Sequence, residues 1–269
     1  MNAASKLITQ ARKIVLKFGS NTLAGSDGRI NHALLEEFAE QTAKLIKQGK
    51  QIVIVSSGAQ IAGLSTMDKW ERKRDIHYRQ ALCAVGQVKL MNAWEQAFLP
   101  QGINIAQILL TREDFADNTR TLNMRNTLFT LVDEGILPII NENDTVSVAE
   151  IKIGDNDTLA AHSAILWSAD LLILFSDIDG LYDKNPNKHS DAQLVETVTD
   201  LASARLSAIS EESDGGAGEF GTGGIVTKLE AAELSVSYGI PMILSHGGHK
   251  QALDALAAGS GNSTAFLVH

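Results

Sequence analysis

The residues best suited to chemistry lie in one acidic and amide-rich stretch, residues 141–144 and 152–157. This stretch follows the apolar run 137–140, which has the composition of a buried strand. In α/β proteins, polar residues directly after a buried strand often line a ligand site. Carboxylates and amides together suit a charged small molecule, and also the magnesium that accompanies a nucleotide. The alternative is an acidic loop that caps the helix expected near Thr158, but the density of polar groups favours a site.

Two lysines and three small-residue turns lie elsewhere in the chain. Lys17 ends an apolar run and is followed by Gly19 and Ser20, whose backbone and hydroxyl groups could meet phosphate oxygens. Residues 221–228 read Gly-Thr-Gly-Gly-Ile-Val-Thr-Lys and lead into a helix, as a phosphate cradle does. Ser57 stands at a strand-to-helix turn, where it could face an anion or cap the helix. Taken singly, each feature also fits a solvated strand end, a hinge or a tight turn.

Together these features indicate phosphoryl transfer. The reaction needs cations that offset the charge growing on the transferred group, and carboxylates that orient those cations or bind metal. It needs no serine, cysteine or histidine nucleophile if both substrates are aligned side by side. Ser176 and Asp177 follow another apolar run, 171–175, and could meet the nucleotide, although alone they fit an ordinary turn.

Composition excludes several other classes of protein. The 269 residues carry a formal net charge of −9, whereas nucleic-acid-binding proteins normally present a basic face. The single cysteine, Cys83, rules out an internal disulfide framework, fits a reducing compartment and reads as an inert core thiol. No apolar run approaches the roughly 18 residues of a membrane span. We therefore predict a cytoplasmic protein that binds neither nucleic acid nor membrane.

The pattern of apolar residues predicts the elements that must position these groups. Strands are expected at residues 13–18, 51–55, 103–109, 136–140, 171–175 and 241–244. Helices are expected at 31–48, 87–96, 121–134, 158–167 and 227–238, the last followed by Gly239 as a cap. This alternation predicts an α/β fold, a three-layer αβα sandwich with a mainly parallel central sheet. The loop at 210–224, rich in glycine, serine and acidic residues, is expected to be functional or a lid.

The motifs resemble those of the amino-acid kinase family, and within it the glutamate 5-kinase branch. The resemblance covers residues 14–267 and is carried by Lys17-Phe-Gly-Ser, Val55-Ser-Ser57-Gly-Ala, Asn141-Glu-Asn-Asp144, Gly154-Asp-Asn-Asp157 and 221–228, with Ala84-Val-Gly-Gln87 and Leu109-Leu-Thr-Arg112 adding to it. The Asn-Glu-Asn-Asp and Gly-Asp-Asn-Asp pair is the specific part. The resemblance implies ATP-dependent phosphorylation of the side-chain carboxylate of L-glutamate, the first step of proline synthesis.

The resemblance also implies a role for each residue. Lys17 and Lys228 would stabilise the moving phosphoryl group, and Asp157 would hold both lysines in place. Ser57, Asp144 and Asn156 would bind glutamate, with Asp144 facing its ammonium group. The nucleotide would be held by Lys17, Ser176, Asp177, Thr222, Gly223, Gly224, Ile225, Val226, Thr227 and Lys228. The cofactor Mg²⁺ would be carried by the ATP phosphates rather than by protein ligands.

Further expectations concern the molecule as a whole. Many members of this branch carry a C-terminal PUA domain, whereas residues 1–269 are expected to form a single kinase domain without it. The family also implies feedback inhibition by proline and a homo-oligomer, a dimer or a tetramer. The alternatives are a sister kinase for N-acetylglutamate or aspartate, and an amino-acid sensor without catalysis. A dehydrogenase is disfavoured because no dinucleotide fingerprint follows the first strand.

Overall fold

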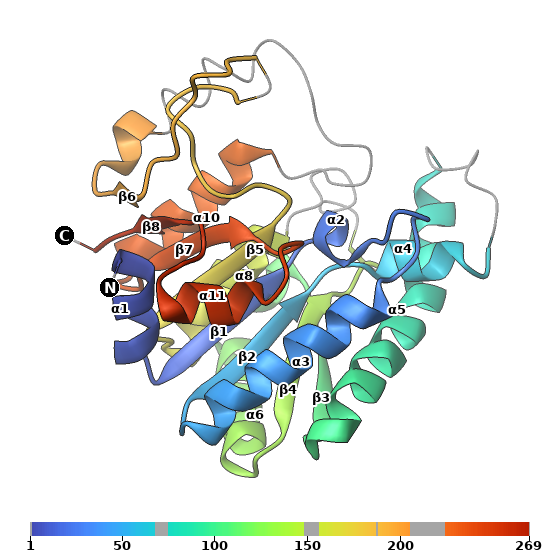
Figure 1. Cartoon of the computed structure of the whole chain (residues 1–269). Coiled ribbons are helices and arrows are strands. Elements are labelled where there is room, and N and C mark those ends of the chain that lie inside the picture. Colours follow the sequence, from blue (N-terminus) through green and yellow to red (C-terminus); the bar gives the residue numbers. More distant parts are fainter. Residues whose placement is uncertain (1, 68–74, 148–155, 187, 205–223, 269) are drawn as a thin grey trace.

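The computed structural model describes residues 2–67, 75–147, 156–186, 188–204 and 224–268. In these residues an eight-stranded sheet forms the centre of the molecule, in the order β3-β4-β2-β1-β5-β7-β8-β6 (Figure 1). The strands are β1 (Lys13–Phe18), β2 (Gln51–Ser56), β3 (Ile105–Leu110), β4 (Leu137–Glu142), β5 (Leu171–Ser176), β6 (Thr197–Val198), β7 (Met242–His246) and β8 (Thr264–Phe266). Neighbouring strands are parallel except for the antiparallel pair β7 and β8.

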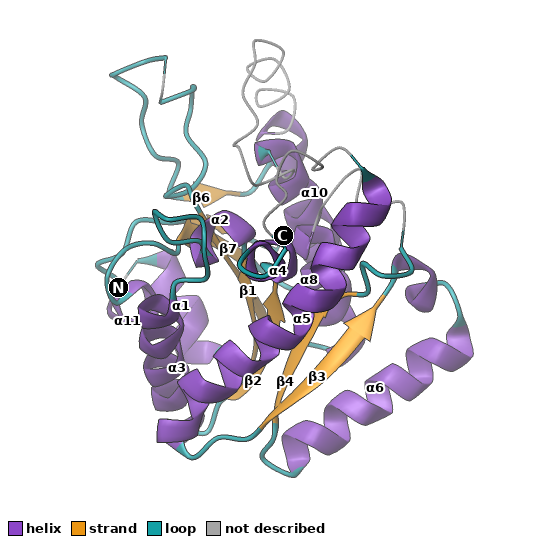
Figure 2. Ribbon diagram, turned by 90° about the vertical axis from the view of Figure 1, so that its right-hand side faces the viewer, coloured by secondary structure: helices purple, strands orange, loops and turns teal. Residues whose placement is uncertain are grey.

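Helices cover both faces of the sheet, which confirms the three-layer αβα sandwich. One layer contains α1 (Ala3–Gln10), α3 (His32–Lys47), α4 (Ala59–Leu64), α5 (Ile76–Phe98) and α11 (Ala252–Ala258). The other contains α6 (Asn118–Asp133), α8 (Asn156–Trp167) and α10 (Ile225–Ser237). Figure 2 shows the edge strand β3 between α5 and α6, which belong to opposite layers. Short turns of helix, α2 (Ser20–Leu23), η2 (Leu99–Gln101) and η3 (Arg112–Phe115), complete the described elements.

The order of the strands predicts where a ligand would bind relative to the sheet. After β1, the next three strands of the chain, β2, β3 and β4, lie on one side of β1 in the sheet. The strands that follow, β5 and β7 among them, lie on the other side. β1 and β5 are therefore neighbours whose following connections run to opposite sides. Ligands of open α/β sheets bind outside the carboxyl ends of the strands at such a point.

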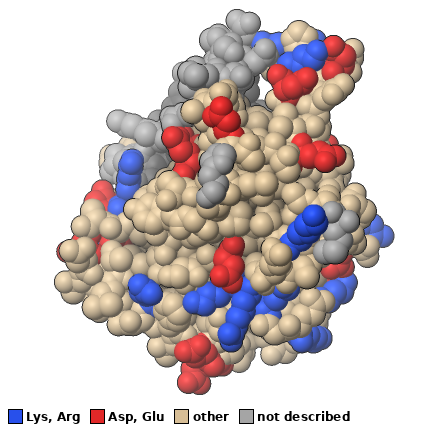
Figure 3. Space-filling model, turned by 90° about the vertical axis from the view of Figure 1, so that its left-hand side faces the viewer, with Lys and Arg blue, Asp and Glu red and all other residues tan. Residues whose placement is uncertain are grey.

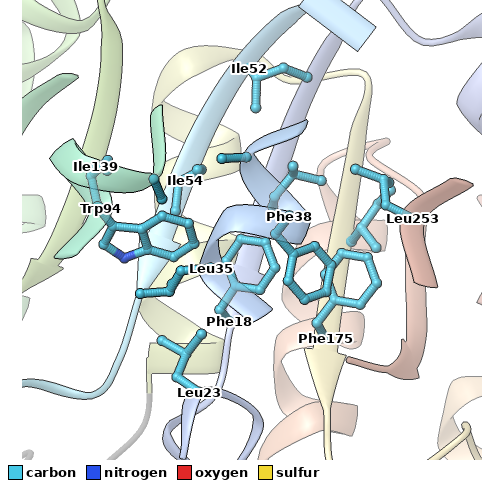
Figure 4. Close-up of a cluster of buried hydrophobic side chains, with 14 of the residues drawn as sticks. Phe18, Leu23, Leu35, Phe38, Ile52, Ile54, Trp94, Ile139, Phe175 and Leu253 are labelled. Carbon is cyan, nitrogen blue, oxygen red and sulfur yellow. The ribbon is translucent and has the colours of Figure 1, made fainter. Parts of the chain in front are cut away.

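The residues of β1 alternate between the two layers. Phe18 contacts the first layer, where its ring lies 4.6 Å from that of Phe38 and 5.3 Å from that of Phe175 (Figure 4). Val15 belongs to the core of the second layer, with α8 and α10. Because side chains alternate along a strand, Lys17 shares the face of Val15 and points toward α8 and α10. One strand thus contributes both to the aromatic core and to a charged site.

The expected elements match the observed ones, with several differences. α5 begins at Ile76, well before the expected start at residue 87, because the Asp75 carboxylate accepts from the backbone N–H groups of His77 and Tyr78 and caps the helix. Gly58, rather than Ser57, is the N-cap residue of α4, with a φ of 103°. Gly239 follows α10 with a φ of 79°, the left-handed conformation that glycine favours after a helix.

The outer surface carries charges of both signs. The side of the molecule where both labelled chain ends lie shows acidic and basic side chains among each other, with a broad band that carries neither (Figure 3). Among the described helices, none has the length and apolar character that a membrane crossing requires.

Candidate active site

Lys17, Asp157 and Lys228 meet in one buried cluster. Lys17 comes from the end of β1, Asp157 from the first turn of α8 and Lys228 from the first turn of α10. The Lys17 ammonium donates to Oδ1 of Asp157, and Nζ of Lys228 donates to Oδ2 of the same carboxylate at 3.2 Å. The exposed fractions are 5% for each lysine and 1% for Asp157. One carboxylate therefore joins two lysines that lie 140 and 71 positions away from it in the sequence.

The two ammonium groups stabilise the ionised form of Asp157. Burial raises the pKa of this carboxyl, but the charges and hydrogen bonds of Lys17 and Lys228 outweigh burial and hold the pKa well below its usual range. Counting these three groups alone, two positive charges face one negative charge. The cluster therefore retains an excess positive charge, which suits a ligand on which negative charge develops.

The helix ends around this cluster offer further donors for an anion. The N-cap residue of α10 is Gly224, which has no side chain to cap the first-turn N–H groups. Thr227 donates its hydroxyl to the Gly224 carbonyl at 2.9 Å and lies 3.4 Å from Oδ2 of Asp157. N–H groups at a helix N-terminus, together with the helix dipole, favour phosphate or carboxylate ligands.

A chain of carboxamide groups extends from Asn156, the neighbour of Asp157. Nδ2 of Asn156 donates to the Ser57 hydroxyl at 2.7 Å and to Oδ1 of Asn141 at 2.9 Å. Nδ2 of Asn141 in turn donates to Oε1 of Gln87 at 2.7 Å. We call Gln87, Asn141, Asn156 and Ser57 the amide chain. It connects α5, β4, α8 and the residue after β2, next to the lysine cluster.

Asp144 lies against the same helix as Gln87. Cys83 stands one turn before Gln87 in α5, and its thiol contacts the Asp144 carboxylate. Burial, reinforced by that carboxylate, raises the pKa of the Cys83 thiol far above its usual value. Cys83 is 5% exposed, which agrees with an inert core thiol. Asp144 thus belongs to the same region as the amide chain.

Asp177 connects the end of β5 to α2, the short helix that follows β1. Asn21 donates to Oδ2 of Asp177 at 2.7 Å, and the Ser176 hydroxyl donates to Oδ1 at 3.0 Å. Burial raises the Asp177 pKa, but these hydrogen bonds and the charge of Lys228 lower it below the usual value overall. Asp177 therefore lies within electrostatic reach of Lys228. Polar groups therefore follow both β1 and β5, the neighbouring strands whose connections run to opposite sides of the sheet.

The described site residues fall into three adjoining groups. They are the lysine cluster with Thr227 and Gly224, the amide chain with Ser57 and Asn156, and the pair Ser176 and Asp177. Asp144 contacts Cys83 on the helix that carries Gln87. Ile225 and Val226 lie in the first turn of α10. Thr222, Gly223 and most of the loop 210–224 lie outside the described residues.

Sequence reasoning gave no role to Gln87 or Asn21. Gln87 is a polar residue in an otherwise apolar stretch of α5, and Asn21 follows directly on the Lys17-Phe-Gly-Ser motif. These positions, and the Ala84-Val-Gly-Gln87 motif, were the available signals. Within the described ranges, no group of three or more His, Cys, Asp or Glu side chains could hold a metal ion.

Comparisons with known proteins agree with this architecture. The sequence profile described as "Amino acid kinase family" matches residues 12–246. The chain is 58% identical over 261 residues to "Glutamate 5-kinase" of Alkaliphilus metalliredigens (strain QYMF), and the match covers 97% of each protein. It is 41% identical to "Glutamate 5-kinase" of Treponema pallidum (strain Nichols), over 97% of this chain and 98% of the relative.

Solved structures share the fold at low sequence identity. "Carbamate kinase from Giardia lamblia bound to AMP-PNP" has a TM-score of 0.65 at 16% identity, covering 97% of this chain and 100% of that one. An isopentenyl phosphate kinase has a TM-score of 0.64 at 18% identity, covering 94% and 99%. These structures support the fold, whereas the acceptor substrate must be argued from this chain's own residues.

Proposed function

This chain belongs to the amino acid kinase family, and we propose that it transfers the γ-phosphoryl group of ATP to the side-chain carboxylate of L-glutamate. The product is γ-glutamyl phosphate, which fits the first step of proline synthesis. The observation that carries the proposal is the buried cluster of Lys17, Asp157 and Lys228. The 58% identity to a protein named glutamate 5-kinase supports the choice of acceptor.

The cluster suits in-line transfer to an anion. A γ-carboxylate oxygen of glutamate forms a bond to the γ-phosphorus of ATP as the bond to the β,γ-bridging oxygen breaks, and ADP leaves. Because the carboxylate is already ionised, no general base is required. In our proposal, Lys17 and Lys228 offset the charge of the transferred group and Asp157 keeps both ammonium groups aimed at it.

Magnesium fits this site as part of the nucleotide. Both oxygens of Asp157 accept from ammonium groups, so this carboxylate is committed to the lysines rather than to a metal. We propose that Mg²⁺ enters bound to the ATP phosphates and neutralises part of their charge. Ser176, Asp177, Gly224, Ile225, Val226 and Thr227, together with Thr222 and Gly223, would hold that nucleotide.

The proposed acceptor side recognises both ends of a free amino acid. Asp144 would pair with the α-ammonium group of glutamate, and Ser57 and Asn156 would bind its polar atoms. N-acetylglutamate has no ammonium group and would gain nothing from a carboxylate at Asp144. The ammonium group is why we prefer glutamate to N-acetylglutamate; aspartate also has one, and we prefer glutamate to it on the 58% identity to a protein named glutamate 5-kinase.

The test is the formation of acyl phosphate, trapped by hydroxylamine as a hydroxamate, with glutamate, N-acetylglutamate and aspartate in parallel. We expect turnover with glutamate. Turnover only with one of the other two acids would overturn the assignment of the acceptor. Lys228→Ala should abolish transfer while glutamate still binds in calorimetry, because Asp144, Ser57 and Asn156 remain. A wild-type protein that binds glutamate but transfers no phosphate would instead be a sensor.

We further propose feedback inhibition by proline, a homo-oligomer and a cytoplasmic location. Proline inhibition follows from the proposed pathway, and a cytoplasmic location fits a single buried cysteine. Proline added to the hydroxamate assay and light scattering of the purified protein test the first two.

A further inference from the structure

The amide chain fixes which hydrogen-bonding group each member presents. Both N–H bonds of the Asn156 carboxamide are used, one to Ser57 and one to Asn141. Its oxygen therefore remains to accept a hydrogen bond. The Ser57 hydroxyl oxygen accepts from Asn156, so the hydroxyl proton remains to be donated. Asn156 thus offers an acceptor, suited to an ammonium group, and Ser57 offers a donor, suited to a carboxylate.

This polarity depends on the orientation of Asn141. Its Oδ1 accepts from the backbone N–H of Glu142 at 2.8 Å as well as from Asn156. Its Nδ2 donates to Oε1 of Gln87. Asn141 is 2% exposed, so water cannot readily replace Gln87 as that acceptor. The carboxamide of Asn141 is therefore held at its oxygen by the backbone and at its nitrogen by Gln87.

Gln87 is itself held in place by helix packing. A Cβ atom at the preceding residue, Gly86, would lie 1.7 Å from the Ala59 carbonyl oxygen, so the backbones of α5 and α4 touch at this point. Gln87 is 8% exposed, and its Nε2 has no hydrogen-bond partner among the described residues. A buried carboxamide with an unused donor destabilises the fold, which argues that its acceptor atom has another role.

We propose that Gln87 is a positioning residue for the acceptor substrate. By accepting from Asn141, it holds Asn156 and Ser57 in the polarity that matches the ammonium and carboxylate groups of an amino acid. Gln87 acts through Asn141 and makes no contact with the transferred phosphoryl group. The inference rests on the proposed function, because glutamate is the acceptor that the amide chain would read.

The main test variant is Gln87→Met, which keeps the length of the side chain and removes its carboxamide. We expect the KM for glutamate to rise at least about tenfold, because Asn156 or Ser57 would lose one hydrogen bond to a charged group of the substrate. The kcat and the KM for ATP should stay within about threefold. Gln96→Met on the exposed side of the same helix is the matched control and should match wild type. An unchanged KM for glutamate in Gln87→Met would overturn the proposal.

Two further variants separate positioning from direct contact. Gln87→Glu keeps an acceptor for Asn141 and should recover most of the affinity for glutamate. A Gln87→Glu variant as weak as Gln87→Met would overturn the relay. Adding Asn141→Leu to Gln87→Met should raise the KM no further than Asn141→Leu alone, whereas additive losses would contradict action through Asn141.

The wild-type reaction distinguishes failure of this inference from failure of the proposed function. If wild type forms no γ-glutamyl phosphate, the proposed function fails. If wild type forms it and Gln87→Met has the wild-type KM, only the role of Gln87 fails. Thermal unfolding of each variant verifies that a change in KM does not reflect loss of the fold.

Discussion

Asp157 keeps two like charges together in a buried site. Without it, the ammonium groups of Lys17 and Lys228 would repel each other across a region that water enters poorly. A single carboxylate that accepts from both cations removes this conflict and fixes the distance between them. Its chemical role is therefore to position cations rather than to move a proton.

Replacing Asp157 by asparagine tests this role with little change in shape. The carboxamide of the Asp157→Asn variant would offer one oxygen instead of two and no charge, so the two lysines would separate. We expect kcat in the hydroxamate assay to fall about 10²–10³-fold, the range seen when one stabilising group of a transition state is lost. Asp254→Asn is the control, because the Lys44–Asp254 pair is exposed and contributes about 1 kcal/mol or less. A near-normal kcat in Asp157→Asn would contradict the proposed role.

The same carboxylate predicts a pH dependence of stability. The folded-state pKa of Asp157 is lowered, so its stabilising effect is fully present above about pH 4, the pKa of an unfolded aspartate, and is lost as the pH falls through the folded value. At pH 7 the free energy of unfolding of wild type should exceed that of Asp157→Asn by about 3–5 kcal/mol. Urea unfolding at pH 7, 5, 4 and 3 should show this gap narrow below pH 4. A gap that is constant with pH would mean that the stabilisation does not come from the ionised carboxylate.

The groups of this site could be predicted from the sequence more readily than their connections. Lys17, Asp157 and Lys228 stood out because lysines beside glycine-rich turns and a dense acidic stretch are uncommon local features. Gln87 was part of the Ala84-Val-Gly-Gln87 motif but received no role, because its role depends on Asn141 lying opposite it, 54 positions away. Local spacing carries no information about such a contact, and only the packed helices bring the two amides together.

At the scale of elements, α4 and α5 pack so closely that glycine is required on both helices. A Cβ at Gly63 would lie 2.1 Å from the Leu82 carbonyl oxygen, and one at Gly86 would lie 1.7 Å from that of Ala59. α4 starts immediately after Ser57 and Gly58, and α5 carries Gln87. The contact between these helices therefore sets the distance between two ends of the amide chain.

Gly86→Ala should damage both stability and substrate binding. The added methyl group must push α4 away, which we expect to lower the free energy of unfolding by about 1–3 kcal/mol or more and to raise the KM for glutamate. The control Ala84→Gly lies on the exposed side of α5 and should cost about 1 kcal/mol through helix propensity alone. Chemical denaturation and steady-state kinetics measure the two effects. A Gly86→Ala protein with a normal KM for glutamate would show that the position of α4 does not govern the acceptor site.

The elements themselves were predictable in proportion to their length and apolar character. β1, β2, β4 and β5 are nearly continuous apolar runs, and their positions agree within about two residues with the sequence pattern. β6 and β8, with two and three residues, are too short to show any period and were not predicted. The first part of α5 was missed because the helix packs on the sheet and on two helices, so its apolar residues do not form one stripe.

At the scale of the whole molecule, the proposed site joins both halves of the sheet. The acceptor residues follow β2 and β4, and the nucleotide residues follow β5 and begin α10, with the lysine cluster between them. Each ligand should therefore stabilise the fold separately. The protein as a whole carries a net charge of −9, which repels two anionic substrates. The local positive charge of Lys17 and Lys228 is therefore needed to attract them.

Thermal unfolding with single ligands tests this arrangement. Glutamate at about 100 times its Kd should add about 2.7 kcal/mol to stability and raise Tm by about 5 °C, without nucleotide or metal. Removing Mg²⁺ with EDTA should stop transfer but leave this shift intact, because Ser57, Asp144 and Asn156 need no metal to bind glutamate. A glutamate-induced shift that disappears in EDTA would place the metal on the acceptor side and contradict a nucleotide-borne Mg²⁺.

The alternation of Lys17 and Phe18 along β1 has a consequence for how this gene can change. Deleting or duplicating one codon of β1 before Lys17 would exchange the faces on which the following residues lie. Phe18 would then point into the charged cluster and Lys17 toward the aromatic rings. No compensating replacement at a single position could repair both faces. Reading-frame-preserving insertions should therefore be tolerated in surface connections and selected against in these six residues, even where the inserted amino acid is a good strand former.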